Sequence, residues 1–288
     1  MVAVTAPARH PLKDGRAPAW AAAWGEDRYG AFAAFAVGPP DKPVEQRMRW
    51  IPPGTFVMGS PGTERGRFSN EGPQHEVILT RGYWLGETPV TQALWVAVMG
   101  ENSSRFRGDG PVDLERPVEL VSWDDCQAFI DRLNAKVAGH AARLPTEAEW
   151  ERACRANTQG ATWVGELSEE EDAPELDAIA WYRGNSGGKT HPVRRKAPNS
   201  YGLHDMLGNV YEWCADAVED IAKPYPRTVG SVTDPVAAEQ GSDRVYRGGS
   251  WVSNARLVRA ANRSAFTRDD RYDYLGFRLA GGQASARR

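Results

Sequence analysis

The sequence is most informative at Pro198-Asn-Ser-Tyr-Gly-Leu-His-Asp-Met-Leu-Gly-Asn-Val-Tyr-Glu-Trp213, where turn-forming residues are mixed with apolar and aromatic ones. The apolar residues of this stretch follow neither the period of a helix nor the alternation of a strand, and after residue 155 the chain shows little regular hydrophobic periodicity. Glycine, asparagine and proline favour turns, whereas large aromatic rings can fix irregular segments in place. With 11 Trp, 29 Gly and 20 Pro in 288 residues, the chain is expected to be rich in loops that such rings hold.

The first half carries clearer signals of regular structure. Residues 48–59 predict a strand, a turn and a second strand, and the alternation in residues 74–79 predicts another strand. Helices are expected to begin after Thr91, Ser122 and Thr146, and the last two of these residues start capping-box patterns. Helices and strands followed by a long irregular region indicate the α+β class.

Composition divides the chain into four parts. Residues 1–18 are rich in alanine, proline and charge and are expected to be flexible, as are residues 281–288. Residues 19–47 predict a short amphipathic segment that docks through its aromatic side chains, followed by a proline-containing linker. Residues 48–280 predict a single domain, because 41% of the chain is hydrophobic and can form a core.

Several strings occur in a fixed order between residues 48 and 280. They are Ile51-Pro-Pro-Gly-Thr-Phe-Val-Met-Gly59, Glu87-Thr-Pro-Val-Thr91, Arg116-Pro-Val, Arg143-Leu-Pro-Thr-Glu-Ala-Glu-Trp-Glu151, the stretch ending at Trp213, Arg247-Gly-Gly-Ser-Trp251 and Leu275-Gly-Phe-Arg278. Together they resemble the formylglycine-generating enzyme (sulfatase-modifying factor) family. The resemblance implies an irregular, loop-rich C-type-lectin-like fold, in agreement with the expectation from the residues.

The resemblance also bears on catalysis. In catalytic members of that family, two cysteines after the Gly-Gly-Ser-aromatic string bind copper(I), an ion that thiolates suit. The matching positions here are Ser253 and Val258, and no cysteine follows Cys214. Cys126 and Cys154 lie in helical apolar patterns and are expected to be buried free thiols. The oxidase chemistry therefore has no evident metal site, and the chain is expected not to be an enzyme of this type.

Residues 244–280 resemble a more specific pattern, the variable region of diversity-generating retroelement target proteins. Randomised asparagine codons in such regions do not yield Lys, Glu, Gln, Met or Trp. The segment contains none of the first four, and its single Trp is Trp251 in the Gly-Gly-Ser-Trp string. A decayed enzyme drifting at its old site would give a similar pattern. The expected ligand-contact positions are Val252, Ser253, Asn254, Leu257, Ser264, Ala265, Phe266, Asp270, Tyr272, Asp273 and Tyr274.

A structural calcium ion is a second implication of the resemblance. Asn209, the carbonyl of Val210 and Glu212 match one calcium site of the catalytic relatives, and hard oxygen ligands suit calcium. Alternatively, Asn209 caps a turn and Glu212 pairs with a buried arginine. No other cofactor is required. The arginines expected to be buried or stacked structural residues are Arg247, Arg259, Arg263 and Arg278.

Three functions are open at this point. The first is a non-catalytic protein that presents its contact positions to an unidentified protein or other macromolecular ligand. The second is an oxidoreductase that converts sulfatase cysteines to formylglycine, and the third is an accessory or immunity interaction protein. The net charge of −3 argues against nucleic acid as the partner. The sequence shows no membrane span and no signal peptide, which favours the cytoplasm and leaves surface display open.

Overall fold

The computed structural model describes residue 12 and residues 17–108, 110–222, 230–236 and 241–282. The α-helices in these residues are α1 (Gln92–Met99), α2 (Trp123–Lys136) and α3 (Glu147–Arg155). Each begins as predicted, because the side chains of Thr91, Ser122 and Thr146 accept hydrogen bonds from backbone N–H groups of the first turn. Both capping boxes are present. Within the described residues, none of the helices has the length and apolar character needed to cross a membrane.

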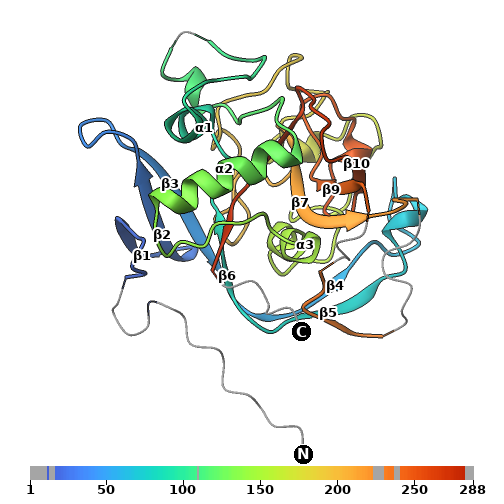
Figure 1. Cartoon of the computed structure of the whole chain (residues 1–288). Helices are drawn as coiled ribbons and strands as arrows, with labels where there is room; N and C mark the ends of the chain where they lie inside the picture. The colour runs from blue at the N-terminus through green and yellow to red at the C-terminus, as the bar shows by residue number, and fades with distance from the viewer. Residues whose placement is uncertain (1–11, 13–16, 109, 223–229, 237–240, 283–288) are drawn as a thin grey trace, which may run out of the picture.

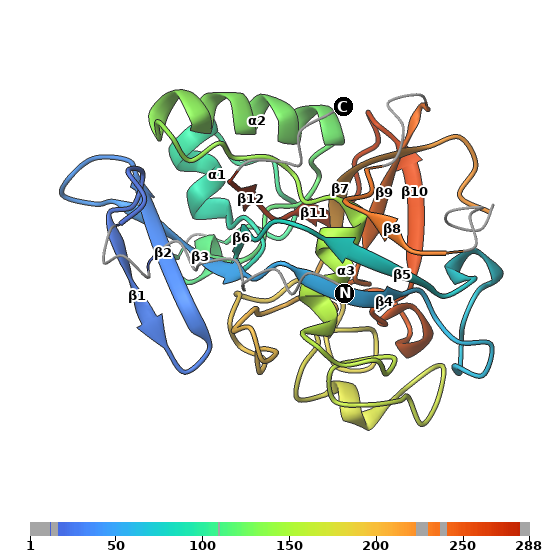
Figure 2. The same ribbon diagram turned by 90° about the horizontal axis from the view of Figure 1, so that it is seen from below.

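The described strands form three sheets (Figures 1 and 2). The strand orders are β1-β2-β3-β6-β12, β10-β9-β7-β11 and β4-β5-β8. Pairing is antiparallel except between β11 and β7 and between β5 and β8. The strands are β1 (Ala23–Asp27), β2 (Gly30–Val37), β3 (Val44–Ile51), β4 (Gly54–Met58), β5 (His75–Leu79), β6 (Tyr83–Gly86), β7 (Tyr211–Val218), β8 (Val232–Thr233), β9 (Asp243–Arg247), β10 (Arg263–Thr267), β11 (Leu275–Phe277) and β12 (Ala280–Gly281).

Long irregular connections join these elements, above all after α3, and confirm the α+β, loop-rich class. Aromatic rings fill the core between them, as the composition predicted. Trp95 of α1 stacks on Phe129 of α2 with ring centroids 5.3 Å apart, and the edge of Phe277 in β11 contacts both rings. Offset and edge-to-face rings at this spacing attract one another. The short 3-10 helices are η1 (Ser69–Glu71), η2 (Asp113–Glu115), η3 (Pro174–Leu176) and η4 (Ala255–Leu257).

The N-terminal segment differs from the sequence-based expectation. Residues 23–37 form the hairpin β1–β2 instead of a docking segment and linker, and β2 pairs with β3 across the boundary expected at residue 48. Figure 2 shows this hairpin (blue) projecting at one end of the molecule. Trp20 does pack through its ring, against Phe35 and Trp84. The strand β2 gave little signal because its alanines have low strand propensity, and its pairing with β3 overrides that preference.

Candidate ligand-binding face

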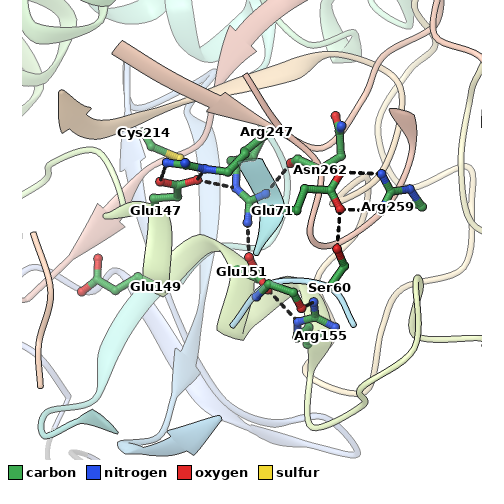
Figure 3. Close-up of polar contacts among 12 residues, drawn as sticks. Ser60, Glu71, Glu147, Glu149, Glu151, Arg155, Cys214, Arg247, Arg259 and Asn262 are labelled. Carbon is green, nitrogen blue, oxygen red and sulfur yellow. Dashed lines mark hydrogen bonds and ion pairs between the residues drawn. The ribbon is translucent and has the colours of Figure 1, made fainter. Parts of the chain in front are cut away.

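Buried arginines tie the C-terminal segment to α3. Arg247 in β9 contacts Glu151 and the carbonyl of Asn262, and its Nε lies 3.3 Å from Glu147. Arg263 in β10 binds the same Glu147 through two nitrogens, each 2.7 Å from a carboxylate oxygen. Figure 3 shows Arg247 between Glu147 and Glu151 of α3. Glu147 and Glu151 therefore anchor β9 and β10.

Arg259, which precedes β10, and Arg278, which follows β11, are held by buried carboxylates in the same way. Arg259 donates to Glu64 at 2.5 Å and to both oxygens of Glu71 at 2.5 and 2.8 Å. Arg278 donates to both oxygens of Glu212 at 2.8–3.1 Å. The guanidinium groups of Arg247, Arg259 and Arg278 are fully buried, and a buried charge is tolerated only with such partners. The prediction that these are structural arginines is confirmed, and we call the four the arginine frame.

A stack of aromatic side chains lies on the face of β9 and β10 opposite to that of Arg247 and Arg263, because side chains alternate along a strand. The ring of Phe266 on β10 lies 4.6 Å from that of Tyr246 and 4.5 Å from that of Tyr272, measured between centroids. Tyr272 in turn stacks on Tyr274 at 5.0 Å. Phe266, Tyr272 and Tyr274 are half-buried, so part of each residue is accessible to solvent. We call these three residues the aromatic face.

Trp251 connects the aromatic face to the remaining contact positions. Its indole Nε1 donates to the carbonyl of Asp273 at 3.0 Å. Val252, the next residue, is 41% exposed, and Asn254 beyond it donates to Glu171 at 3.2 Å. The structure thus places the stretch that carries Val252 and Asn254 beside the loop that carries Asp273. The other half-buried contact positions are Leu257, Ser264, Ala265, Asp270 and Asp273.

Ser253 does not belong to this surface, because its side chain is buried and only 3% of the residue is exposed. Its hydroxyl accepts a hydrogen bond from the Ser250 N–H at 3.0 Å and donates to the Tyr211 hydroxyl at 3.1 Å. Val258 is fully buried. Both residues at the family's copper-ligand positions are therefore scaffold residues here. The expectation that Ser253 contacts a ligand is wrong, since the Gly-Gly-Ser-Trp turn directs it inward.

The cysteines offer no accessible thiolate. Cys126, Cys154 and Cys214 are free and buried, which confirms the expectation for the first two. Burial raises the pKa of each thiol above its usual value, and that of Cys154 to about 12. Copper(I) binds the thiolate rather than the thiol. With no sulfur at Ser253 or Val258, the residues present do not fit the copper ion of the catalytic relatives.

The residues expected to hold calcium are already hydrogen-bonded within the protein. Glu212 accepts from Arg278 with both oxygens, and from the Trp150 indole at 2.7 Å. The Asn209 side chain accepts from the His191 N–H and donates to the His191 carbonyl, both at 3.0 Å. Calcium would have to displace the guanidinium from the carboxylate, so this set does not fit the ion. The geometry matches the alternative, in which Asn209 supports a turn and Glu212 pairs with a buried arginine.

Glu119 is a residue behind the contact surface that the sequence did not reveal. Its side chain is fully buried, and one carboxyl oxygen accepts from the Phe106 N–H at 2.7 Å. The other oxygen has no hydrogen-bond partner among the residues the structure describes. Burial raises the pKa of Glu119 to about 7, with a further contribution from Asp273. Because the Phe106 ring contacts Trp251 at 5.2 Å, this carboxyl lies beneath the contact surface.

Through Glu119, the protein is expected to lose stability as the pH rises from about 4.5 to about 7. In that interval the unfolded chain has released this proton while the folded protein retains it, so the free energy of unfolding falls with pH. The shift corresponds to a loss of up to about 3 kcal/mol. Glu119→Gln should remove most of it, as measured by urea unfolding at pH 5 and pH 8. The exposed Glu115→Gln is the control, and equal pH dependence in all three proteins would contradict the assignment.

The geometry defines a class of protein: an irregular α+β domain of lectin-like type, whose last segment forms a solvent-facing surface over a buried arginine frame. The family follows from comparison with known proteins. The chain belongs to the sulfatase-modifying factor family, since the Sulfatase-modifying factor enzyme 1-like domain matches residues 35–282.

Individual relatives include both a variable protein and enzymes. The structure of Treponema denticola variable protein 1 is similar with a TM-score of 0.74 and 34% identity, over 87% of this chain and 98% of that one. The formylglycine-generating enzyme of Thermomonospora curvata is 37% identical over 218 residues, which cover 67% of each chain. The mouse formylglycine-generating enzyme is 33% identical over 72% of this chain, which spans only 53% of the mouse protein. The lectin-like fold expected from the sequence motifs is thereby confirmed.

Proposed function

We propose that this chain is a non-catalytic ligand-binding protein whose contact positions, other than Ser253, meet a protein or other macromolecular ligand. The aromatic face is the observation that carries the proposal. Its rings supply contact area at a low cost in side-chain entropy, and half-buried serine and aspartate side chains beside them can adapt their hydrogen bonds. The arginine frame holds this surface rigid before a ligand arrives, which limits the entropy lost on binding. The similarity to a variable protein supports the same function.

We further propose that a retroelement diversifies the contact positions. The support is their placement, since the half-buried and exposed positions alternate with buried frame residues such as Arg259 and Arg263. Sequencing the DNA around the gene tests this idea. A near-identical template repeat together with a reverse-transcriptase gene is the expected result. Flanking DNA that lacks both would contradict diversification, but it would not contradict the ligand-binding proposal.

The enzymes among the relatives favour formylglycine formation as a second candidate function, and a direct assay separates the two. The purified chain, supplied with copper(I), oxygen and a cysteine-containing sulfatase peptide, is expected to consume no more oxygen than a protein-free blank. The peptide should keep its thiol, as judged by its mass. The physical reason is that Ser253 and Val258 offer no sulfur and Cys214 is buried. The Thermomonospora curvata enzyme is the positive control, and an aldehyde product formed by this chain would establish the oxidase.

A further inference from the structure

Arg244 differs from the other arginines around the aromatic face. In the described part of the chain it forms no ion pair, whereas its neighbours Arg268 and Arg271 bind Asp124 and Asp125. The Arg271 pair is bidentate, with nitrogen–oxygen distances of 2.7 and 2.8 Å. Two guanidinium groups of this surface are thus neutralised by aspartates, and the third is not.

The guanidinium of Arg244 is held in place and partly desolvated. Its central carbon lies 4.5 Å from the centroid of the Trp123 ring, and its buried Nε has no hydrogen-bond partner among the described residues. Burial, and then the charge of Arg268, lower the pKa of Arg244. Asp124 and Asp216 oppose this effect from beyond ion-pair distance. A partly buried cation without a carboxylate is unfavourable, and an anion that supplies oxygens would relieve it.

The position of Arg244 connects it to the aromatic face. In the sheet, Arg244 of β9 is directly opposite Phe266 of β10. Residues opposite one another on antiparallel strands share a face, with Cβ atoms about 5 Å apart. A ligand lying on Phe266 therefore has the free guanidinium beside it.

We propose that Arg244, stacked on Trp123 beside Phe266, binds a carboxylate side chain of the protein's ligand. This inference rests on the proposed ligand-binding function and specifies the chemistry of its partner, an acidic segment of a protein. The planar fork of arginine matches the two oxygens of a carboxylate. One unneutralised guanidinium suits a singly charged carboxylate better than a doubly charged phosphate, since Arg268 and Arg271 are already paired.

Sodium acetate is the probe that tests the site, titrated at constant ionic strength into 15N-labelled protein. The expected result is a saturable shift of the Trp123 indole and Arg244 Nε–H resonances. Arg244→Gln should abolish the Trp123 shift. Arg271→Gln is the matched control, because it removes the same charge from the same surface but takes it from an arginine that binds Asp125. Arg268 is unsuitable, because its guanidinium also lies over the Trp123 ring and its loss would free Asp124. The Arg271→Gln variant should retain the shift.

Three results would overturn the proposal. They are a non-saturating shift equal to that with chloride, an equal loss in both variants, and saturation by phosphate at concentrations where acetate has no effect. The amide spectra of the variants establish that they are folded. Because acetate is the probe, a failure here is independent of whether the aromatic face binds a macromolecule. If the Arg244→Gln variant binds a macromolecular ligand as tightly as the unchanged protein, the ligand-binding function is supported and the carboxylate site at Arg244 is excluded.

Discussion

Replacing Arg278 with leucine is expected to lower the free energy of unfolding by about 3–5 kcal/mol. The Arg278 guanidinium is fully buried, donates to both oxygens of Glu212 at 2.8–3.1 Å and donates to the Gly86 carbonyl at 2.7 Å. Without it, the buried Glu212 carboxyl retains the Trp150 indole as a donor but loses its compensating charge. The carboxyl must then remain uncompensated or take up a proton. Equilibrium urea unfolding measures the loss.

A surface ion pair provides the control for this effect. Arg65 and Glu169 lie 3.9 Å apart, with 53% and 71% of their side chains exposed. Exposed pairs of this kind contribute less than about 1 kcal/mol, so Arg65→Leu should leave the urea midpoint nearly unchanged. If Arg278→Leu were no more destabilising than Arg65→Leu, the buried pair would not be a main support of the C-terminal segment.

Gly276→Ala is expected to destabilise the protein by about 1–3 kcal/mol or more, through a steric clash with the backbone. A Cβ atom at Gly276 would lie 2.3 Å from the carbonyl oxygen of Val118. Neither backbone can move easily, because Gly276 lies in β11 beside β7 and the Val118 N–H is bonded to Val90. This close approach explains the glycine in the Leu-Gly-Phe-Arg string. Thermal unfolding followed by circular dichroism measures the effect.

Gly62→Ala is the matched control for the glycine substitution. A Cβ atom there meets no neighbour within 4 Å, and its backbone does not adopt the left-handed conformation. Its melting temperature should stay close to that of the unchanged protein. Equal melting temperatures for the two variants would show that the loop carrying Val118 yields, and that β11 is less rigid than its packing indicates.

The helix starts could be predicted because their signals are local. Ser122 and Asp125 are three residues apart, and their capping box depends on little else in the chain. The arginine frame was predictable in part. Buried arginines in an irregular domain need carboxylate partners, but the pairing of Arg247 with Glu151 joins residues 96 positions apart. No local pattern identifies such a pair, so the partners had to come from the structure.

The surface itself was predicted less completely than its frame. The segment containing Phe266, Tyr272 and Tyr274 was identified by its resemblance to retroelement variable regions and by its composition, and neither carries information on side-chain direction. Ser253 was therefore included although its hydroxyl bonds inward to Tyr211. Glu119 was missed for a related reason, because a single glutamate near a helix start has the ordinary appearance of an exposed residue. Its burial depends on the packing of the segment around Phe106 over it.

Selection from a library tests most directly whether the C-terminal surface is a ligand-binding face on a rigid scaffold. The library randomises all contact positions except Ser253, is displayed on yeast and is selected against lysozyme as the protein probe. A parallel library randomises the arginine frame. Most members of the first library should stay folded, as judged by protease resistance, whereas the second library should be largely unfolded. Lysozyme binders should lose binding when their contact positions are changed back to the original residues. Equal unfolding of the two libraries, or binders whose affinity survives that change, would contradict a ligand-binding face on a rigid scaffold.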